Sequence, residues 1–385
     1  MTFKIWSRFG KARLLAVVVI WAGVGWLSFE MTQVAEAARQ ASGQQGLVQL
    51  TDRAWAWVAP DERTANGALF VGDDAALLVD PGLTPDLARQ FLAAAREATD
   101  RPIRFAVTTH GHLDHALGIA CLSDRELEVV AHPKTRRSLA ERGARIAALI
   151  AADAASPEER AELEACRLRL PDRTVPDREV IDLGGHRVEV FHPGVAHTHG
   201  DLIVWSPVEG VLATGDLFLR DASPYMGEGS AVGWKEALDR LVDLDAQHVI
   251  PGHFDVGSTE DLARFRDYIS ALIERVGAAL AQGVAPEEAA RRVDFPEFAD
   301  FGQYPQYDAT FEGNALAVAR ELALRPAERG EGAGFRVLTT VDVGQNPHQI
   351  DFTPDGEAAY IAAAGSDQVV RVDAQSYRVT ETLAV

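Results

Sequence analysis

The stretch TTHGHLDHALG constrains the fold of this chain more than any other feature of its sequence. It follows a predicted strand over Ile103–Thr108 and places His110, His112, Asp114 and His115 within six residues. Removing so many imidazole and carboxylate groups from water is unfavourable unless a partner compensates them. Neutral imidazoles and a carboxylate are good ligands for zinc or iron. The stretch therefore predicts a metal centre at the end of a strand.

The spacing within this stretch further predicts two metal subsites. Side chains alternate along an extended chain, so His110 and His112 are expected on one side of it. Asp114 and His115 begin the following turn and are expected to face elsewhere.

Three later stretches repeat the arrangement of an apolar run followed by a side chain that can bind metal. They are EVFHPGVAHTHGD with His197, GVLATGDLF with Asp216, and HVIPGHFDV with His253. Loops at strand ends, held by a rigid sheet, commonly carry functional residues. If the four strand ends converge, they bring seven ligands to one place.

The order of predicted elements indicates an α/β fold. Apolar runs bounded by turn residues predict strands over Gly46–Val58, Ala68–Val79, Ile103–Thr108, Glu179–Ile181, Arg187–Phe191, Leu202–Ser206, Val211–Thr214 and His248–Ile250. Helical spacing predicts a helix that starts at Thr84-Pro85, and others over Thr135–Cys166, Trp234–Leu244, Ala285–Val293 and Asn314–Leu324. The first two strand regions are expected to be hairpins. Strands interleaved with helices are typical of α/β domains.

Residues 1–37 are predicted to be a secretory signal peptide. Four basic residues precede the apolar run Leu14–Leu27, which is followed by the A-x-A sequence Ala35-Glu36-Ala37. The alternative is an uncleaved helix that anchors the protein in the membrane, because the run approaches the roughly 17 residues that can span a bilayer. Both interpretations place the folded part outside the cytoplasm, as a periplasmic or secreted protein.

Composition excludes some partners. The 385 residues are 47% hydrophobic, enough for a core, and carry a formal net charge of -20, which disfavours binding to nucleic acid phosphates. Two cysteines, Cys121 and Cys166, are too few for a disulfide scaffold or a cysteine zinc site. They either pair or stay as small core residues.

The C-terminal region predicts a different kind of structure. FRVLTTVDV at Phe335–Val343 and YRVTETLAV at Tyr377–Val385 align at an offset of 42 residues, and a period of roughly 40 to 50 with strand-rich content marks propeller blades. The region resembles a YVTN-type β-propeller blade. Propellers typically use four to eight blades, so the chain is expected to be truncated or the blade to dock on an unknown partner. The predicted domains are thus residues 46–325, a linker over 326–334 and the blade over 335–385.

Taken together, these motifs resemble the metallo-β-lactamase superfamily over Gly46–Leu324. The resemblance implies a four-layer αββα sandwich and two Zn²⁺ ions, with iron as the alternative metal. It further implies that Asp80, in LVDPG, contacts the metal ligands without binding metal itself. The implied metal ligands are His110, His112 and His197 for one ion and Asp114, His115 and His253 for the other, with Asp216 between them.

The resemblance implies a metal-dependent hydrolase that acts on a small molecule. Two metals can share a water and lower its pKa, so that a bridging hydroxide attacks an ester, thioester, lactone or amide carbonyl. Asp114 is the predicted catalytic residue, which orients this nucleophile or accepts its proton. Typical β-lactamases carry Cys or Ser where Asp216 stands, so β-lactam hydrolysis is expected only as a side activity. The sequence is more similar to the glyoxalase-II-like branch and, within it, to zinc hydrolases of the quinoprotein relay type.

Two alternatives from other classes remain at this stage. One is a persulfide dioxygenase with a single iron on the same scaffold, and the other is a non-catalytic exported scaffold. His199 and Tyr225 are candidates for lining the substrate pocket, and His199 also for binding metal. The remaining histidines are predicted to be structural, without a paired ligand nearby: His132, His186, His192, His248 and His348.

Overall fold

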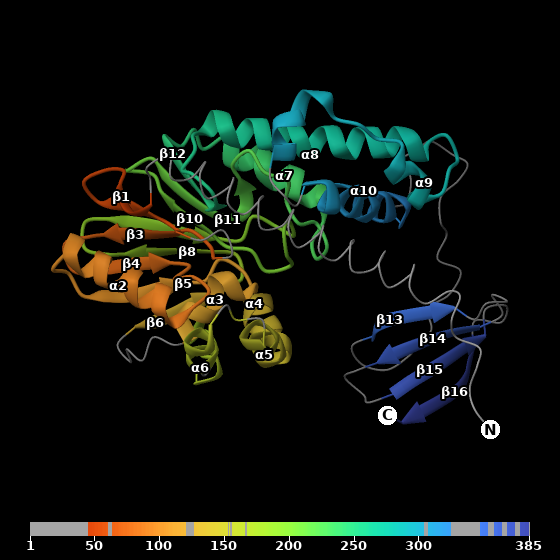
Figure 1. Ribbon diagram of the computed structural model, residues 1–385, viewed down its shortest axis with the longest axis horizontal. Helices are drawn as coiled ribbons and strands as arrows, with labels where there is room; N and C mark the ends of the chain where they lie inside the picture. The colour runs from red at the N-terminus through yellow and green to blue at the C-terminus, as the bar shows by residue number, and fades with distance from the viewer. Residues whose placement is uncertain are drawn as a thin grey trace, which may run out of the picture. The chain divides into compact units, whose positions relative to one another are not determined.

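The computed structural model describes residues 45–60, 64–120, 127–152, 154, 156–165, 168–303, 307–324, 347–352, 358–363, 368–373 and 378–384. The chain divides into two compact units between Leu324 and Arg325, and each unit is described by itself (Figure 1). The predicted signal peptide, the linker 326–334, the run Phe335–Val343 and both cysteines lie outside the described residues. None of the helices in the described part of the chain combines the length and apolar character that a membrane span requires.

Seven strands in chain order form the first sheet: β1 (Gly46–Gln49), β2 (Ala54–Val58), β3 (Gly67–Val71), β4 (Ala76–Val79), β5 (Ile103–Val107), β6 (Glu128–Ala131) and β7 (Arg173–Thr174). The first four strands pair antiparallel, which confirms the two predicted hairpins. From β4 onward the strands are parallel. The carboxyl ends of β4 and β5 therefore lie at the same edge, with Asp80 and the histidine stretch directly after them.

Five strands form the second sheet, in the order β12-β11-β10-β9-β8. They are β8 (Arg178–Asp182), β9 (Arg187–Phe191), β10 (Ile203–Ser206), β11 (Val211–Leu219) and β12 (His248–His253). Strands β8 to β11 pair antiparallel, and β12 joins β11 in parallel. All nine residues of β11 are buried, as expected for a strand covered on both faces.

The two sheets stack face to face with helices outside both (Figure 1). Apolar side chains of both sheets form one buried cluster between them, with Phe70 and Leu77 from the first sheet and Val190 and Val204 from the second. On the outer side of the first sheet lie α2 (Pro85–Ala98), α3 (Leu113–Ala120), α4 (Pro133–Ser138), the π-helical turn η1 (Leu139–Gly143), α5 (Ala144–Ala152) and α6 (Pro157–Ala165). This is the expected αββα sandwich.

The outer side of the second sheet carries the largest buried cluster in the described chain. Its helices are α7 (Ala231–Val242), α8 (Thr259–Leu280), α9 (Pro286–Arg291), the 3₁₀ segment η2 (Pro296–Gln303) and α10 (Tyr307–Leu324). Trp234 of α7 is buried there, and its indole Nε1 donates to the carbonyl oxygen of Leu217 in β11 at 2.9 Å. This hydrogen bond and the surrounding apolar contacts join α7 to β11.

Most predicted helices are present with shifted ends. Thr84 caps α2 by accepting a hydrogen bond from Leu87 N, with Pro85 in the first turn, as the sequence predicts. The predicted helical region Thr135–Cys166 contains α4, η1, α5 and α6. The 22-residue α8 was not predicted, although Ser258 and Asp261 form a capping box at its start.

Two strands are longer than predicted, and this changes where two site residues lie. Strand β11 continues past Thr214 to Leu219, so Asp216 lies inside a strand rather than after one. Strand β12 ends at His253 itself, not at Ile250. The prediction failed because a glycine directly precedes both Asp216 and His253. In a sequence, a glycine suggests that a strand ends, but inside a strand it can instead mark a bulge or a close approach of another backbone.

The second unit is an antiparallel four-stranded sheet of β13 (Pro347–Phe352), β14 (Ala358–Ala363), β15 (Gln368–Asp373) and β16 (Val379–Ala384). Ala358, Ala359, Val370 and Val372 are buried in it, whereas Val379 and Leu383 of β16 are exposed. The predicted all-β tail is therefore present as a four-stranded antiparallel meander, while its assignment as a propeller blade stays a prediction.

Candidate metal centre

Asp216 lies at the centre of the site because of an irregularity in β11. The register between β11 and β12 shifts on both sides of Gly215, whose φ of 52° favours glycine. A Cβ atom on Gly252 of β12 would lie 1.9 Å from Oδ1 of Asp216. The bulge turns the Asp216 carboxylate away from the strand ladder. Because Gly252 has no side chain, it leaves room for that carboxylate.

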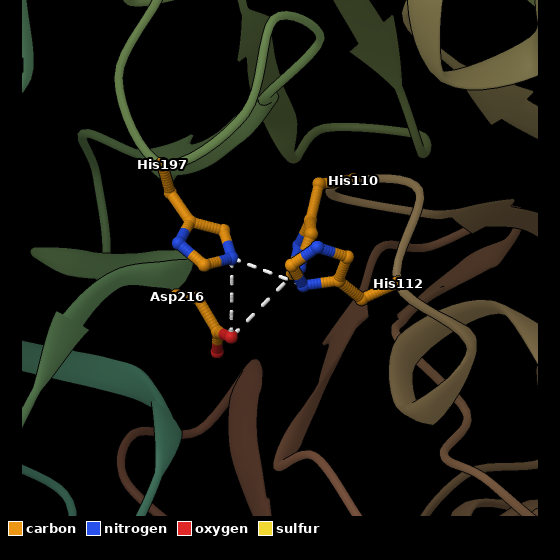
Figure 2. A group of neighbouring side chains, drawn as sticks. All are labelled: His110, His112, His197 and Asp216. Atoms are coloured by element: carbon orange, nitrogen blue, oxygen red, sulfur yellow. Dashed lines mark hydrogen bonds and ion pairs between the residues drawn. The ribbon is translucent and has the colours of Figure 1, made fainter. Parts of the chain in front are cut away.

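The first ligand group contains three histidines and one oxygen of Asp216 (Figure 2). Nε2 of His197 lies 3.1 Å from Nδ1 of His112 and 3.5 Å from Oδ2 of Asp216. Nε2 of His110 lies 3.8 Å from the same carboxylate oxygen. The candidate ligand atoms all lie within 4.8 Å of one another.

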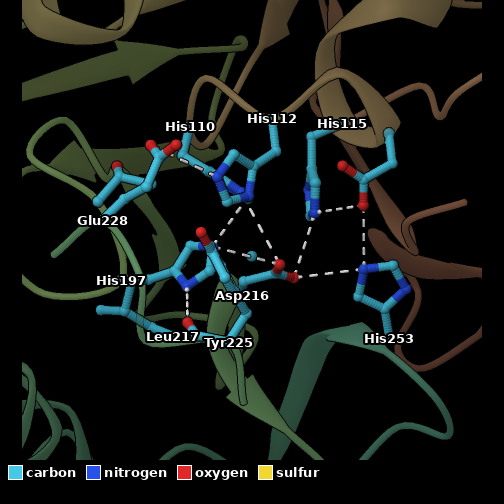
Figure 3. Close-up of polar contacts among 12 residues, drawn as sticks. His110, His112, His115, His197, Asp216, Leu217, Tyr225, Glu228 and His253 are labelled. Atoms are coloured by element: carbon cyan, nitrogen blue, oxygen red, sulfur yellow. Dashed lines mark hydrogen bonds and ion pairs between the residues drawn. The ribbon is translucent and has the colours of Figure 1, made fainter. Parts of the chain in front are cut away.

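The second ligand group shares Asp216 with the first and takes its other oxygen (Figure 3). Oδ1 of Asp216 lies 3.2 Å from Nε2 of His115 and 3.5 Å from Nε2 of His253. Oδ2 of Asp114 lies 3.4 Å from Nε2 of His115 and 3.1 Å from Nε2 of His253. One carboxylate therefore faces both groups, which is the arrangement of a bridging ligand.

Unpaired buried atoms show that this donor set suits a cation. Nε2 of His110, Nε2 of His115 and Oδ1 of Asp216 are buried and make no hydrogen bond. Buried polar atoms are normally paired, and those that are not call for an explanation such as an ion. Histidine and carboxylate donors in two groups of four fit divalent metals well. The residues present thus fit the group that the sequence predicts.

A network behind the ligands selects the nitrogen that each imidazole offers. Asp80, which is 1% exposed, accepts from Nδ1 of His115 at 2.8 Å and from Oγ1 of Thr109 at 2.6 Å. Because the hydroxyl proton of Thr109 goes to Asp80, its oxygen is left to accept from Nδ1 of His110 at 3.1 Å. Nδ1 of His197 donates to the carbonyl oxygen of Tyr225 at 3.2 Å. These contacts leave Nε2 of all three histidines free to bind metal.

The two groups differ in their electrostatics. Burial, together with the neighbouring histidines, lowers the pKa of His110 well below its ordinary value. Burial also lowers the pKa of His197 to about 4. Both imidazoles are therefore neutral at pH 7, as metal ligands must be.

In the second group the carboxylates dominate. Burial lowers the pKa of His115, but Asp216, Asp114 and Asp80 outweigh it and raise that pKa well above the ordinary value. The pKa of His253 is raised by Asp216 and Asp114, also against burial. The histidines in turn hold the pKa of Asp216 well below its usual range against the opposing effect of burial. This half of the site concentrates negative charge where a cation is needed.

The structure brings together all seven residues that the sequence singled out as ligands. Tyr225 is 51% exposed, and its ring centroid lies 6.1 Å from that of His112, so it lies at the open side of the site. His199 is exposed and belongs to neither ligand group, so the structure does not support it as a ligand.

Two of the histidines predicted to be isolated lie side by side. The rings of His132 and His192 stack with centroids 4.3 Å apart. Nδ1 of His132 accepts from Lys134 N, and Nδ1 of His192 donates to the carbonyl oxygen of Asp201. The pair therefore has backbone partners and belongs to neither ligand group, which agrees with a structural role.

Sequence reasoning missed two residues of the site. Glu228 lies between glycines on the loop after β11, and its Oε2 is 3.7 Å from Nε2 of His112. Asp201 is 1% exposed and closes the His197 loop by accepting from the backbone N and Oγ1 of Thr198. An acidic residue four positions after a histidine ligand was a signal for Asp201. No local pattern marks Glu228.

Several known proteins are similar to parts of this chain. Residues 60–253 match the family model described as the metallo-beta-lactamase superfamily. A metallo-beta-lactamase type 2 of Bacteroides fragilis is 20% identical over 257 residues, which cover 64% of this chain and 94% of that protein. A solved structure of a metallo-beta-lactamase from Pontibacter korlensis is 21% identical, with a TM-score of 0.46. The match covers 59% of this chain and 99% of the Pontibacter chain. A seven-bladed beta-propeller protein of Mycobacterium tuberculosis is 31% identical over 70 residues, 17% of this chain and 18% of that one.

Proposed function

This chain belongs to the metallo-beta-lactamase superfamily, and from that premise we propose that it is an exported binuclear zinc hydrolase. Its substrate class is a small molecule with an ester, thioester, lactone or amide bond. One observation carries the proposal: Oδ2 of Asp216 faces the three-histidine group, while Oδ1 faces His115 and His253. A carboxylate placed in this way would offer one oxygen to each of two metals, which supports a binuclear site over a mononuclear one.

Two divalent metals, when bound, would polarise the carbonyl oxygen of the substrate and lower the pKa of a water enough for it to act as nucleophile near neutral pH. Asp114 is the residue placed to handle the proton of that water. Its side chain is 24% exposed, and Oδ2 lies between His115 and His253. The carboxylate accepts the proton as water adds to the carbonyl, and returns it to the leaving oxygen, sulfur or nitrogen.

Asp216 also bears on the choice of substrate. Its two oxygens face ligand nitrogens, and a Cβ on Gly252 would collide with Oδ1. With one oxygen toward each group, this carboxylate adds negative charge between them. β-Lactam hydrolysis is therefore proposed only as a side activity, although several relatives carry the name metallo-beta-lactamase.

The N-terminal sequence supports export. The basic, apolar and A-x-A elements of residues 1–37 stand in the order of a secretory signal. Expression of the full chain with fractionation tests this part of the proposal. Recovery of the protein in the periplasm or medium is expected, and recovery in the cytoplasm would contradict export.

The central experiment combines elemental analysis with a substrate screen on the purified protein. Two zinc ions per chain and hydrolysis of at least one thioester, lactone or ester are expected. Asp114→Asn should reduce turnover by at least 100-fold because the proton acceptor is lost, whereas the exposed surface variant Asp73→Asn should match the parent. One iron per chain with oxygen uptake and no hydrolysis would overturn the proposal.

A further inference from the structure

Among the three histidines of the first group, His112 is oriented in a different way from the other two. Nδ1 of His110 is bonded to Thr109 and Nδ1 of His197 to the Tyr225 carbonyl, so both offer Nε2. His112 instead turns Nδ1 toward the group, at 3.1 Å from Nε2 of His197. Its outward nitrogen is Nε2.

A carboxylate faces that outward nitrogen. Oε2 of Glu228 lies 3.7 Å from Nε2 of His112, within ion-pair distance but longer than a hydrogen bond (Figure 3). A carboxylate beside an imidazole favours the tautomer that carries its proton on the facing nitrogen. The proton then stays on Nε2, and the lone pair of Nδ1 points into the metal group.

Arg142 holds Glu228 in this position. Its guanidinium binds the carboxylate with both terminal nitrogens, at 3.0 Å to Oε1 and 3.1 Å to Oε2. One of these nitrogens also donates to Oγ of Ser138 at 2.8 Å. A two-bonded guanidinium fixes the plane of a carboxylate as well as its place. Arg142 lies in η1, so the helical insert reaches the metal centre through this ion pair.

The backbone beneath Glu228 is fixed as well. Ser230 N donates to the carbonyl oxygen of Ala196 at 2.9 Å, and a Cβ on Gly229 would lie 1.7 Å from that oxygen. Glu321 of α10 accepts from Oγ of Ser230 and from Ala231 N. The loop that carries Glu228 is thus clamped between the His197 loop and α10.

We propose that Glu228, held by Arg142, is a positioning residue that fixes the tautomer and ring orientation of His112 for metal binding. The proposal rests on the metal-binding part of the proposed function and is independent of the substrate. It predicts a loss of affinity confined to the three-histidine group.

The test isolates that group. In a His253→Ala background the second group lacks a ligand, and Zn²⁺ affinity is measured by competition with a chromophoric chelator. Adding Glu228→Ala is expected to weaken binding 10- to 100-fold, the usual effect of removing a partner of a ligating histidine. Arg142→Ala should have a smaller effect in the same direction, because the carboxylate remains but is no longer held.

Matched controls lie on the same segment. Arg137 and Glu141 form an exposed ion pair in the insert, so Arg137→Ala and Glu141→Ala should leave the affinity within twofold of the parent. Thermal unfolding of each metal-free variant checks that it folds. The absorption of the Co²⁺-loaded protein should shift in Glu228→Gln and stay unchanged in the controls.

The outcomes separate this inference from the proposed function. If the parent protein takes up no metal, the proposed function fails first. If the parent binds two metals, but folded Glu228→Ala leaves the Zn²⁺ affinity of the His253→Ala background unchanged and Glu228→Gln keeps the Co²⁺ spectrum of the parent, the positioning role of Glu228 is wrong while the hydrolase proposal stands.

Discussion

Oδ2 of Asp80 lies 2.8 Å from Nδ1 of His115, and the same carboxylate reaches His110 through the hydroxyl of Thr109. One buried aspartate therefore orients a ligand in each metal group. Its backbone has a φ of 46°, in the left-handed region, which the turn after β4 imposes.

Replacing Asp80 should weaken both metals together. Asp80→Ala is expected to lower metal affinity 10- to 100-fold in each group. It should also destabilise the fold by about 1–3 kcal/mol for each buried donor left unpaired. Chelator competition and urea unfolding measure the two effects. The exposed Asp73→Ala should show neither, and loss from only one group would disprove the shared role of Asp80.

Gly252→Ala should disable the centre by displacing Asp216. The added Cβ would stand 1.9 Å from Oδ1 of Asp216, so the carboxylate must leave its place between the groups. The expected result is one bound metal or none, by elemental analysis. Gly313→Ala is the matched control: its Cβ meets nothing within 4 Å in α10, and it should raise helix stability by up to about 1 kcal/mol. Two metals in Gly252→Ala would contradict the assigned geometry.

Metal removal should lower stability. A ligand that binds only the folded state stabilises it by about 2.7 kcal/mol at 100 times its Kd. Treatment with a chelator should therefore lower the Tm, and added zinc should restore it. In Asp216→Asn, where the bridging charge is gone, the same treatment should change the Tm much less. Equal Tm values with and without metal in the parent protein would argue against a bound metal.

Asp201 should make stability depend on pH. Burial raises the pKa of its carboxyl to about 7, against hydrogen bonds from Thr198 that lower it. A carboxyl whose pKa is higher in the folded state binds more protons there, so its contribution is full below pH 4 and is lost as the pH rises through 7.

Urea unfolding of the metal-free protein at pH 5 and pH 8 measures this effect. The parent should lose a few kcal/mol between the two values on account of Asp201, since each pKa unit corresponds to about 1.4 kcal/mol. Asp201→Asn does not titrate and should remove most of that difference. If the variant keeps the full pH dependence, Asp201 is not its source.

The sequence alone determined the local features of this protein. Thr84 and Pro85 predicted the start of α2, and alternating apolar residues predicted most strands, because caps and periodicity act over a few neighbouring residues. The stretch from His110 to His115 predicted a metal centre for the same reason: its ligands are close in sequence and cannot be buried together without a cation.

Tertiary structure decided the rest. The bulge at Gly215 that turns Asp216 toward both groups depends on pairing with β12, about 35 positions later in the chain. The contact between Glu228 and His112 joins residues from a glycine-rich loop and a helix start, and it exists only because the sheets stack and α10 clamps the loop. Such contacts form between residues far apart in sequence, so no local pattern records them, and only the packed fold sets their distances.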